Sequence, residues 1–212
     1  HFLLGLMLLG GLNAKQLADF RHFFVMHGEG RNGKTTLLNL WSELLGSDFA
    51  YSASYDVFQL DSNQPPYALA HMFKKRLIYC DETRRFRLNA ARVNAISGNS
   101  NICAREIYKS EINFIPNGVL IFASNHMPEI TDPGDATWGR LVKIYLNYRF
   151  PDAGNKEAPY KKLQEEIPAI INYTIPYALR ILKESWIPAI PQRWAEDNAE
   201  TRKEQNVMEE FA

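Results

Sequence analysis

The sequence of 212 residues predicts an α/β protein with a central, mainly parallel sheet flanked by helices and a β-hairpin inserted into it. Three observations lead to this prediction. Short, continuously apolar runs recur along the chain, which is typical of strands buried on both faces of a sheet. Segments with helical spacing of apolar residues alternate with these runs, and glycine-rich or polar turns separate them. With 46% hydrophobic residues, the chain can also bury a full core.

Four apolar runs are the expected strands of the sheet. They are Phe23–His27, Arg76–Cys80, Gly118–Ala123 and Val142–Tyr148. Two more strand-like runs, Ile102–Ile107 and Glu111–Ile115, are joined by the polar tip Tyr108–Ser110 and predict an antiparallel hairpin. The segment between Asp48 and Pro66 is rich in turn-forming residues, and we expect little regular structure in it beyond a short element at Tyr55–Leu60.

Helical patterns lie between the predicted strands and at both ends of the chain. We expect helices at Phe2–Leu12, from the glycine-rich stretch to Gly46, at Tyr67–Lys74 and at Asn89–Ser97. Pro168 and Pro176 interrupt the helical segment Tyr160–Trp186, which predicts two or three short helices rather than one. The expected organisation is a helical segment packing on the core at 1–22, the core at 23–150, a helical part at 151–190, and a charged terminal helix or linker at 191–212.

Composition limits the possible partners and compartments. Lysine plus arginine equals aspartate plus glutamate at 24 each, so no global field attracts nucleic acid, and any DNA contact needs a local patch. Cys80 and Cys103 lack metal-ligand or disulfide spacing, which indicates a reducing compartment, the cytoplasm of a cell or of an infected host. The apolar run Phe2–Leu12 is too short to span a bilayer. Because the chain starts at His1 inside an apolar helix, we expect a fragment of a longer polypeptide.

A Walker A pattern follows the first predicted strand. The residues concerned, with the threonine after them, are Gly28, Glu29, Gly30, Arg31, Asn32, Gly33, Lys34, Thr35 and Thr36. Glycines let consecutive N–H groups turn toward one anion, and the following helix presents its positive end to the same phosphates. Lys34 would contact the β- and γ-phosphates, and the Thr35 hydroxyl would bind Mg²⁺. A chance glycine-rich turn is the alternative, but the flanking strand and helix favour nucleotide binding.

Four later residues carry groups suited to hydrolysis. Asp81 and Glu82 follow a buried strand, where the aspartate can hold Mg²⁺ and the glutamate can activate the attacking water. Asn125 ends the next strand and can hydrogen-bond the γ-phosphate or that water. Arg140, before the fourth strand, is the candidate cation for a neighbouring subunit's site. An ordinary solvated carboxylate pair, a turn asparagine and a surface arginine are the alternatives.

The order of these motifs resembles that of superfamily 3 helicases, in particular the ATPase domain of phage, plasmid and poxvirus primase-helicases. The resemblance covers about Phe2 to Trp186 and rests on Gly30–Thr35, Asp81-Glu82, Ser97-Gly98 through Ala104-Arg105 with Tyr108-Lys109, Ser124–Pro128 and Trp138–Arg140. It implies an AAA+-like ATPase that uses ATP and Mg²⁺, assembles as a ring, usually a hexamer, translocates on single-stranded DNA and separates duplexes during replication. It also implies that a primase or polymerase module can precede this domain.

The resemblance further implies that the hairpin projects into the ring channel. Lys109 at its tip would contact the DNA backbone, with Arg105 and Tyr108 in support, and a lysine beside an aromatic residue suits a sequence-independent single-strand grip. Asn99 and Ser100 replace a glycine and an aspartate that are common in relatives. Gly139 stands where relatives often have an arginine, so Arg140 is the sole candidate finger.

Two other functions share the same loop. An AAA+-like loader or remodelling switch would hydrolyse ATP on a protein partner without travelling on DNA. A small-molecule kinase or GTPase would need an Asn-Lys-x-Asp guanine reader or an arginine-rich lid after the asparagine strand, and the sequence contains neither. The sequence therefore predicts an ATP hydrolase, with a DNA helicase motor as the first hypothesis and the remodelling switch as the alternative.

Overall fold

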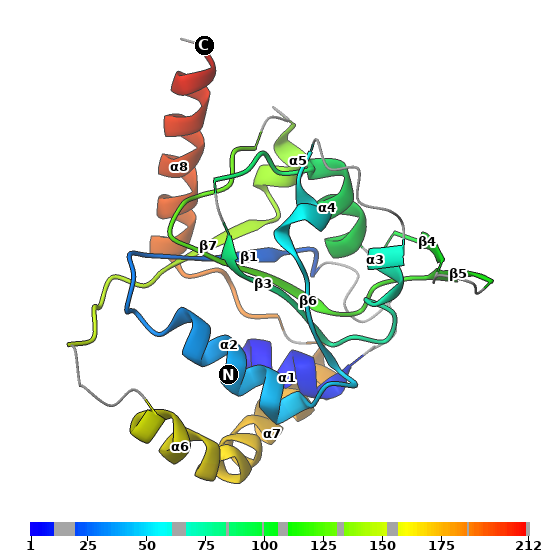
Figure 1. The fold of residues 1–212 in the computed structure, drawn as a ribbon, viewed down its shortest axis with the longest axis vertical. Helices are drawn as coiled ribbons and strands as arrows, with labels where there is room; N and C mark the ends of the chain where they lie inside the picture. The colour runs from blue at the N-terminus through cyan, green and yellow to red at the C-terminus, as the bar shows by residue number, and fades with distance from the viewer. Residues whose placement is uncertain are drawn as a thin grey trace.

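The computed structural model of the protein consists of a central sheet between two layers of helices (Figure 1). It describes residues 1–10, 20–60, 67–83, 85–98, 100–105, 110–130, 134–151, 157–185 and 187–210. The sheet has five strands in the order β2-β3-β6-β1-β7, and every neighbouring pair is parallel. The strands are β1 (Phe23–His27), β2 (Ala50–Ser52), β3 (Leu77–Thr83), β6 (Val119–Ser124) and β7 (Leu141–Tyr145). All five carboxyl ends therefore meet at one side of the sheet, the carboxyl edge, where Lys34, Thr35, Asp81 and Asn125 gather. The amino ends of the strands form the opposite side, the amino edge.

Helices cover both faces of this sheet (Figure 1). One layer contains α1 (Phe2–Leu9), α2 (Lys34–Leu45), α6 (Glu157–Glu165) and α7 (Ile167–Glu184). The other contains η1 (Tyr55–Phe58), α3 (Tyr67–Ala70), α4 (Ala90–Ser97) and α5 (Asp135–Trp138). In the first layer α1 packs closely on α7, since a Cβ on Gly5 would lie 3.0 Å from the backbone nitrogen of Ala178.

Alternating side chains of each strand form two separate cores. Phe23 and Val25 of β1 are buried with Phe58 and Val93 on the α4 face, whereas Met26 is buried with helices α1, α2 and α7. Because successive residues of a strand point to opposite faces, a continuously apolar strand supplies both cores at once. The central strand β6 is buried at every position, as the sequence pattern predicted.

A two-stranded antiparallel hairpin of β4 (Ile102–Arg105) and β5 (Glu111–Phe114) stands apart from the sheet (Figure 1). Its inner face rests on the α4-side core through Ile102, Ala104 and Phe114. Cys103 lies on the outer face and is exposed, whereas Cys80 is completely buried in β3. Burial raises the pKa of the Cys80 thiol far above its ordinary value.

Helix α8 (Gln192–Glu210) lies along the outer edge of β7. The Asn198 side chain donates to the Leu141 carbonyl at 2.7 Å and accepts from the Lys143 N–H at 2.8 Å. One amide side chain thus occupies a donor and an acceptor of an edge strand. Such groups otherwise invite pairing with another chain.

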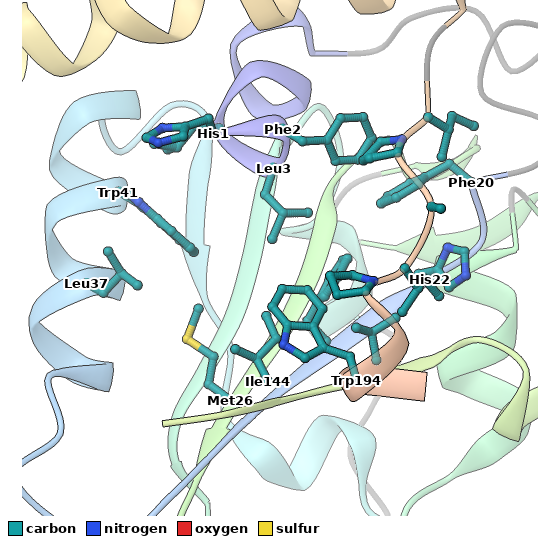
Figure 2. A pocket seen from close by; sticks show the side chains of 18 of the residues that line it. His1, Phe2, Leu3, Phe20, His22, Met26, Leu37, Trp41, Ile144 and Trp194 are labelled. Atoms are coloured by element: carbon teal, nitrogen blue, oxygen red, sulfur yellow. The ribbon is translucent and has the colours of Figure 1, made fainter. Parts of the chain in front are cut away.

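An apolar cavity of about 350 Å³ lies between α1, α2, the strands β1 and β7, and the segment 187–194. Figure 2 shows Leu37 and Trp41 of α2 on one side of it and Trp194 of α8 on another. Met26 and Ile144 line its floor on the sheet. Helix α2 therefore starts at the carboxyl edge of the sheet, and its side chains Leu37 and Trp41 line the apolar cavity.

The predicted fold class is confirmed, with differences at particular elements. The strand β2 falls where we expected turns; it has three residues and is defined by its pairing with β3. The prediction of a helix break at Pro176 is wrong, because Pro176 lies inside α7. Pro176 is exposed, so water can bond the carbonyl that it leaves unpaired, while Ala178 and Ile181 hold the opposite face. Among the described residues, none of the helices is long and apolar enough to cross a membrane.

Candidate nucleotide and metal site

The Walker A loop lies between β1 and α2 at the carboxyl edge of the sheet. Gly33 precedes α2 with φ 82°, a left-handed conformation that glycine adopts without strain. At Gly28 the loop passes so close to the end of β7 that a Cβ would lie 2.4 Å from the Leu146 carbonyl oxygen. Of the other loop residues, Glu29, Gly30 and Arg31 are exposed, as is Thr36 in the first turn of α2. The two constrained glycines explain why the turn needs this sequence.

The Lys34 ammonium group lies at the centre of the loop. It donates to the Gly28 carbonyl at 2.6 Å, to Asn32 Oδ1 at 2.9 Å and to Asn125 Oδ1 at 2.9 Å. Burial lowers the pKa of Lys34 below its ordinary value, and the nearby Asp81 carboxylate partly opposes this effect. The hydrogen bonds of the Lys34 ammonium group all go to oxygen atoms, and a phosphate oxygen can replace these acceptors. The first N–H groups of α2 point the same way because a helix leaves them without internal partners.

Thr35, in the first turn of α2, contacts Asp81 near the end of β3. Thr35 Oγ1 donates to Asp81 Oδ1 at 3.1 Å. Asp81 and Glu82 lie in an irregularity of β3, where the pairing with β6 shifts register between Cys80 and Thr83. Such bulges re-aim side chains next to active sites. A hydroxyl and a carboxylate oxygen are ligands that Mg²⁺ accepts while keeping several waters, so this donor pair fits the ion. The Glu82 side chain lies outside the described part of the structure.

Asn125 comes directly after β6 and is exposed. Since β6 lies between β1 and β3, its carboxyl end brings Asn125 between the loop and the acidic pair. Its bond to Lys34 is the observed link between the loop and this strand. Of the predicted groups, Lys34, Thr35, Asp81 and Asn125 therefore lie together.

Arg140 lies at the opposite edge of the sheet. Its carbonyl accepts from the N–H of Phe23, at the start of β1, and its Nη1 donates to the Asn94 carbonyl at 2.7 Å. Burial lowers the pKa of Arg140, and the positive charge of Arg21 lowers it further. The structure does not bring Arg140 to the Walker A loop of the same chain. Its role toward a neighbouring subunit stays a prediction.

The predicted DNA contacts lie on the hairpin. Arg105 is exposed at the end of β4. Tyr108 and Lys109 are outside the described residues. Their roles stay predictions.

Two features of the site were missed from the sequence. His27, the last residue of β1, stacks on Tyr145 of β7 with ring centroids 5.6 Å apart. Burial lowers its pKa, as do the charges of Lys143 and Lys34. The segment after β7 is the second feature, because it lies against the Walker A loop: Asn32 Nδ2 donates to the Leu146 carbonyl at 3.1 Å. In the sequence, the only feature that marks this segment is that the aromatic residues Tyr148 and Phe150 alternate with polar ones.

Residues 26–140, more than half of the chain, match the model of a family described as a family of unknown function, DUF5906. The chain belongs to this family. It is 28% identical over 163 residues to a candidate helicase of Acanthamoeba polyphaga mimivirus, covering 76% of this chain and 16% of that protein. It is 27% identical over 145 residues to a candidate primase of African swine fever virus, covering 65% of this chain and 15% of the relative. The chain thus spans a small part of both relatives' length.

Solved structures share the fold. The apo structure of the NrS-1 C-terminal region matches with a TM-score of 0.64 and 16% identity, covering 94% of this chain and 47% of that one. Its A form matches with a TM-score of 0.57 and 15% identity, covering 81% of this chain and 39% of that one. At such identity the structural likeness establishes the fold. Together the matches confirm the resemblance to the superfamily 3 primase-helicase type.

Proposed function

We propose that this chain is the ATP-hydrolysing motor of a DNA helicase of the superfamily 3 type. The observation that supports it best is that two residues at the start of α2 contact polar groups from two other elements: Lys34 donates to Asn125, beyond β6, at 2.9 Å, and Thr35 donates to Asp81, in β3, at 3.1 Å. A phosphate site needs only the loop. The addition of a carboxylate and a carboxamide at its terminal-phosphate end favours cleavage over binding alone.

Each group has a role in this proposal. Lys34 and the N–H groups at the start of α2 would hold the phosphates of ATP, and Thr35 with Asp81 would hold Mg²⁺. The bound ion would neutralise charge on the β- and γ-phosphates. Glu82 would accept the proton of the attacking water, and Asn125 would orient that water or the γ-phosphate.

The DNA part of the proposal rests on the hairpin and on the relatives, whose names describe a helicase and a primase. Because the chain has no net charge, a grip on DNA has to come from a local set of cations. Arg105, exposed at the end of β4, and Lys109 would be that set, and Tyr108 would stack on a base. In a ring of copies, six in a hexamer, each hairpin would contact the DNA strand, and ATP hydrolysis would move the hairpins along it.

Hydrolysis is tested with Glu82→Gln. We expect the variant to bind ATP with Mg²⁺ and to lose turnover by roughly a hundredfold, because it keeps the shape but not the basicity of the carboxylate. Binding is measured by calorimetry and turnover by phosphate release. Turnover at the wild-type rate would assign the base to another residue.

Movement on DNA is tested by strand displacement on forked substrates with either tail. We expect unwinding and DNA-stimulated ATPase in the wild-type chain, and a collapse of the ratio of stimulated to unstimulated turnover in Lys109→Ala. Lys183→Ala, an exposed lysine on α7, is the matched control. An assembled protein with DNA-stimulated ATPase but no unwinding on any fork would contradict the helicase. Wild-type ATPase in Lys109→Ala, together with no unwinding by the wild-type chain, would favour the remodelling switch.

A further inference from the structure

Two large aromatic side chains project into solvent just beyond β7. Tyr148 is 63% exposed and Phe150 is 55% exposed. Their rings contact each other edge to face, with centroids 4.9 Å apart and planes at 82°. A contiguous exposed aromatic pair marks a contact surface more often than a single exposed ring does.

Main-chain hydrogen bonds hold this pair against the Walker A loop. The Phe150 N–H donates to the Arg31 carbonyl at 2.8 Å, and the Leu146 N–H donates to the His27 carbonyl at 2.8 Å. A Cβ built on Gly33 would lie 3.4 Å from the Phe150 ring. Figure 1 shows the chain leaving β7 beside the loop that joins β1 to α2. The rings are therefore positioned by the same backbone that would bind phosphates.

The strand order gives the direction of a bound nucleotide. Asn125 follows β6 and Asp81 lies near the carboxyl end of β3, both on one side of β1, whereas Tyr148 and Phe150 follow β7 on the other side. If the terminal phosphate faces Asn125 and Asp81, the nucleoside end of the molecule extends the opposite way. A nucleoside extending in this direction would cross the Walker A loop and reach Tyr148 and Phe150.

We propose that Tyr148 and Phe150 form the base-binding platform of the nucleotide site, and that they bind the base through its ring faces. The inference rests on the proposed function and deepens it by assigning the nucleoside end. Stacking tolerates any base because every base has a π-face, and purines offer the larger one. The predicted ligand class is therefore a purine nucleoside triphosphate with little distinction between adenine and guanine.

The experiment compares ATP with inorganic tripolyphosphate, which lacks the nucleoside, as Mg²⁺-dependent ligands in calorimetry. We expect the wild-type chain to bind ATP and GTP more tightly than tripolyphosphate. Tyr148→Ala and Phe150→Ala should each weaken ATP binding about tenfold, the loss typical of one base–aromatic stack, and leave tripolyphosphate binding as it was. Tyr148→Phe should keep the wild-type ATP affinity.

Tyr173→Ala is the matched control, since Tyr173 is 58% exposed and belongs to an aromatic pair on α7. Because Tyr148 and Phe150 are exposed, their removal should leave the melting temperature unchanged. ATP affinity that survives both alanine variants overturns the platform, and a change in sedimentation in those variants at constant ATP affinity assigns the pair to a subunit contact instead. Failure of wild-type protein to bind either ligand contradicts the proposed function itself.

Discussion

The two edges of the central sheet differ in what they offer a nucleotide. At the carboxyl edge, Lys34 donates to Asn125 and Thr35 donates to Asp81, so groups from the start of α2, from β3 and from just beyond β6 meet there. At the amino edge, Arg140 binds a main-chain carbonyl and has another cation, Arg21, for a neighbour. The length of β1 separates the edges, roughly 16 Å for five residues. A site that needs Lys34 and Arg140 together therefore needs two copies of the chain.

The difference is also electrostatic. Lys34 is surrounded by carbonyl, amide and carboxylate oxygens, which favour its charge against the effect of burial. The pKa of Arg140 is lowered by burial and by Arg21, so a carboxylate or phosphate from a neighbour would relieve an unfavourable arrangement. The carboxyl edge thus surrounds its lysine with oxygen atoms of the same chain, whereas the role of Arg140 toward a neighbouring chain stays a prediction.

The largest effect is expected at the carboxyl edge. Lys34→Ala should lower ATP turnover by roughly a hundredfold or more, because it removes the cation that faces the transferred phosphate. The matched control at the other edge is Lys75→Ala, whose ammonium also binds two main-chain carbonyls, those of Ser47 and Asp48. Phosphate release and melting temperature are measured for both. Equal loss of turnover in the two variants would mean that the edges are not functionally distinct.

A smaller change in turnover is expected when one variant lacks Lys34, the other lacks Arg140, and the two are mixed. Arg140→Ala and Lys34→Ala should each be inactive, but their equimolar mixture should regain turnover, because about a quarter of the interfaces in a random ring combine both intact groups. Phosphate release is followed while the two proteins are mixed at constant total concentration. No recovery in assemblies shown to exchange subunits would exclude Arg140 as a group that acts across the interface.

The smallest effect concerns stability. The pKa of His27 is lowered from 6.5 by burial and by Lys143 and Lys34, and that of His22, at the amino edge, by burial alone. Because these histidines take up protons more readily in the unfolded chain, protonation favours unfolding. Their effect on the free energy of unfolding is absent above about pH 6.5, and this free energy decreases as the pH falls below that value. His27→Gln should reduce the fall in melting temperature between pH 7.5 and 5.5 by about 2 °C, with partial exposure limiting the effect.

His22→Gln is the comparison for this pH effect. We expect it to reduce the fall less than His27→Gln does, since no lysine charge adds to its burial. Thermal melting across the pH series measures both. A wild-type pH profile in His27→Gln would show that the charges at the carboxyl edge do not act on His27.

The sequence predicted those parts that depend on local pattern. Continuous apolar runs identified β1 and β6 because both faces of these strands are buried. Asp81 and Asn125 were predicted as site residues from their order after the Walker A loop, each at the end of an apolar strand, and the parallel sheet brings both to the carboxyl edge. Strand β2 was missed because three residues carry no periodic signal, and pairing with β3 alone makes them a strand.

Long-range contacts account for what was missed at the site. The position of Phe150 depends on a hydrogen bond to Arg31, which is far away in sequence, so no local pattern predicts that its ring lies beside the Walker A loop. The helical path through Pro176 depends on the burial of Ala178 and Ile181, with Ala178 in close contact with Gly5 of α1. In both cases tertiary contacts decided a conformation that local propensity left open or opposed.

The unequal burial of the two cysteines makes the hairpin accessible to selective chemistry. The Cys80 thiol is enclosed in β3 and its raised pKa suppresses the reactive thiolate, whereas Cys103 is exposed on β4. A maleimide dye should therefore attach to Cys103 alone in the folded wild-type chain. Its fluorescence would report the environment of the hairpin directly, before and after nucleotide and DNA are added, without any substitution in the chain.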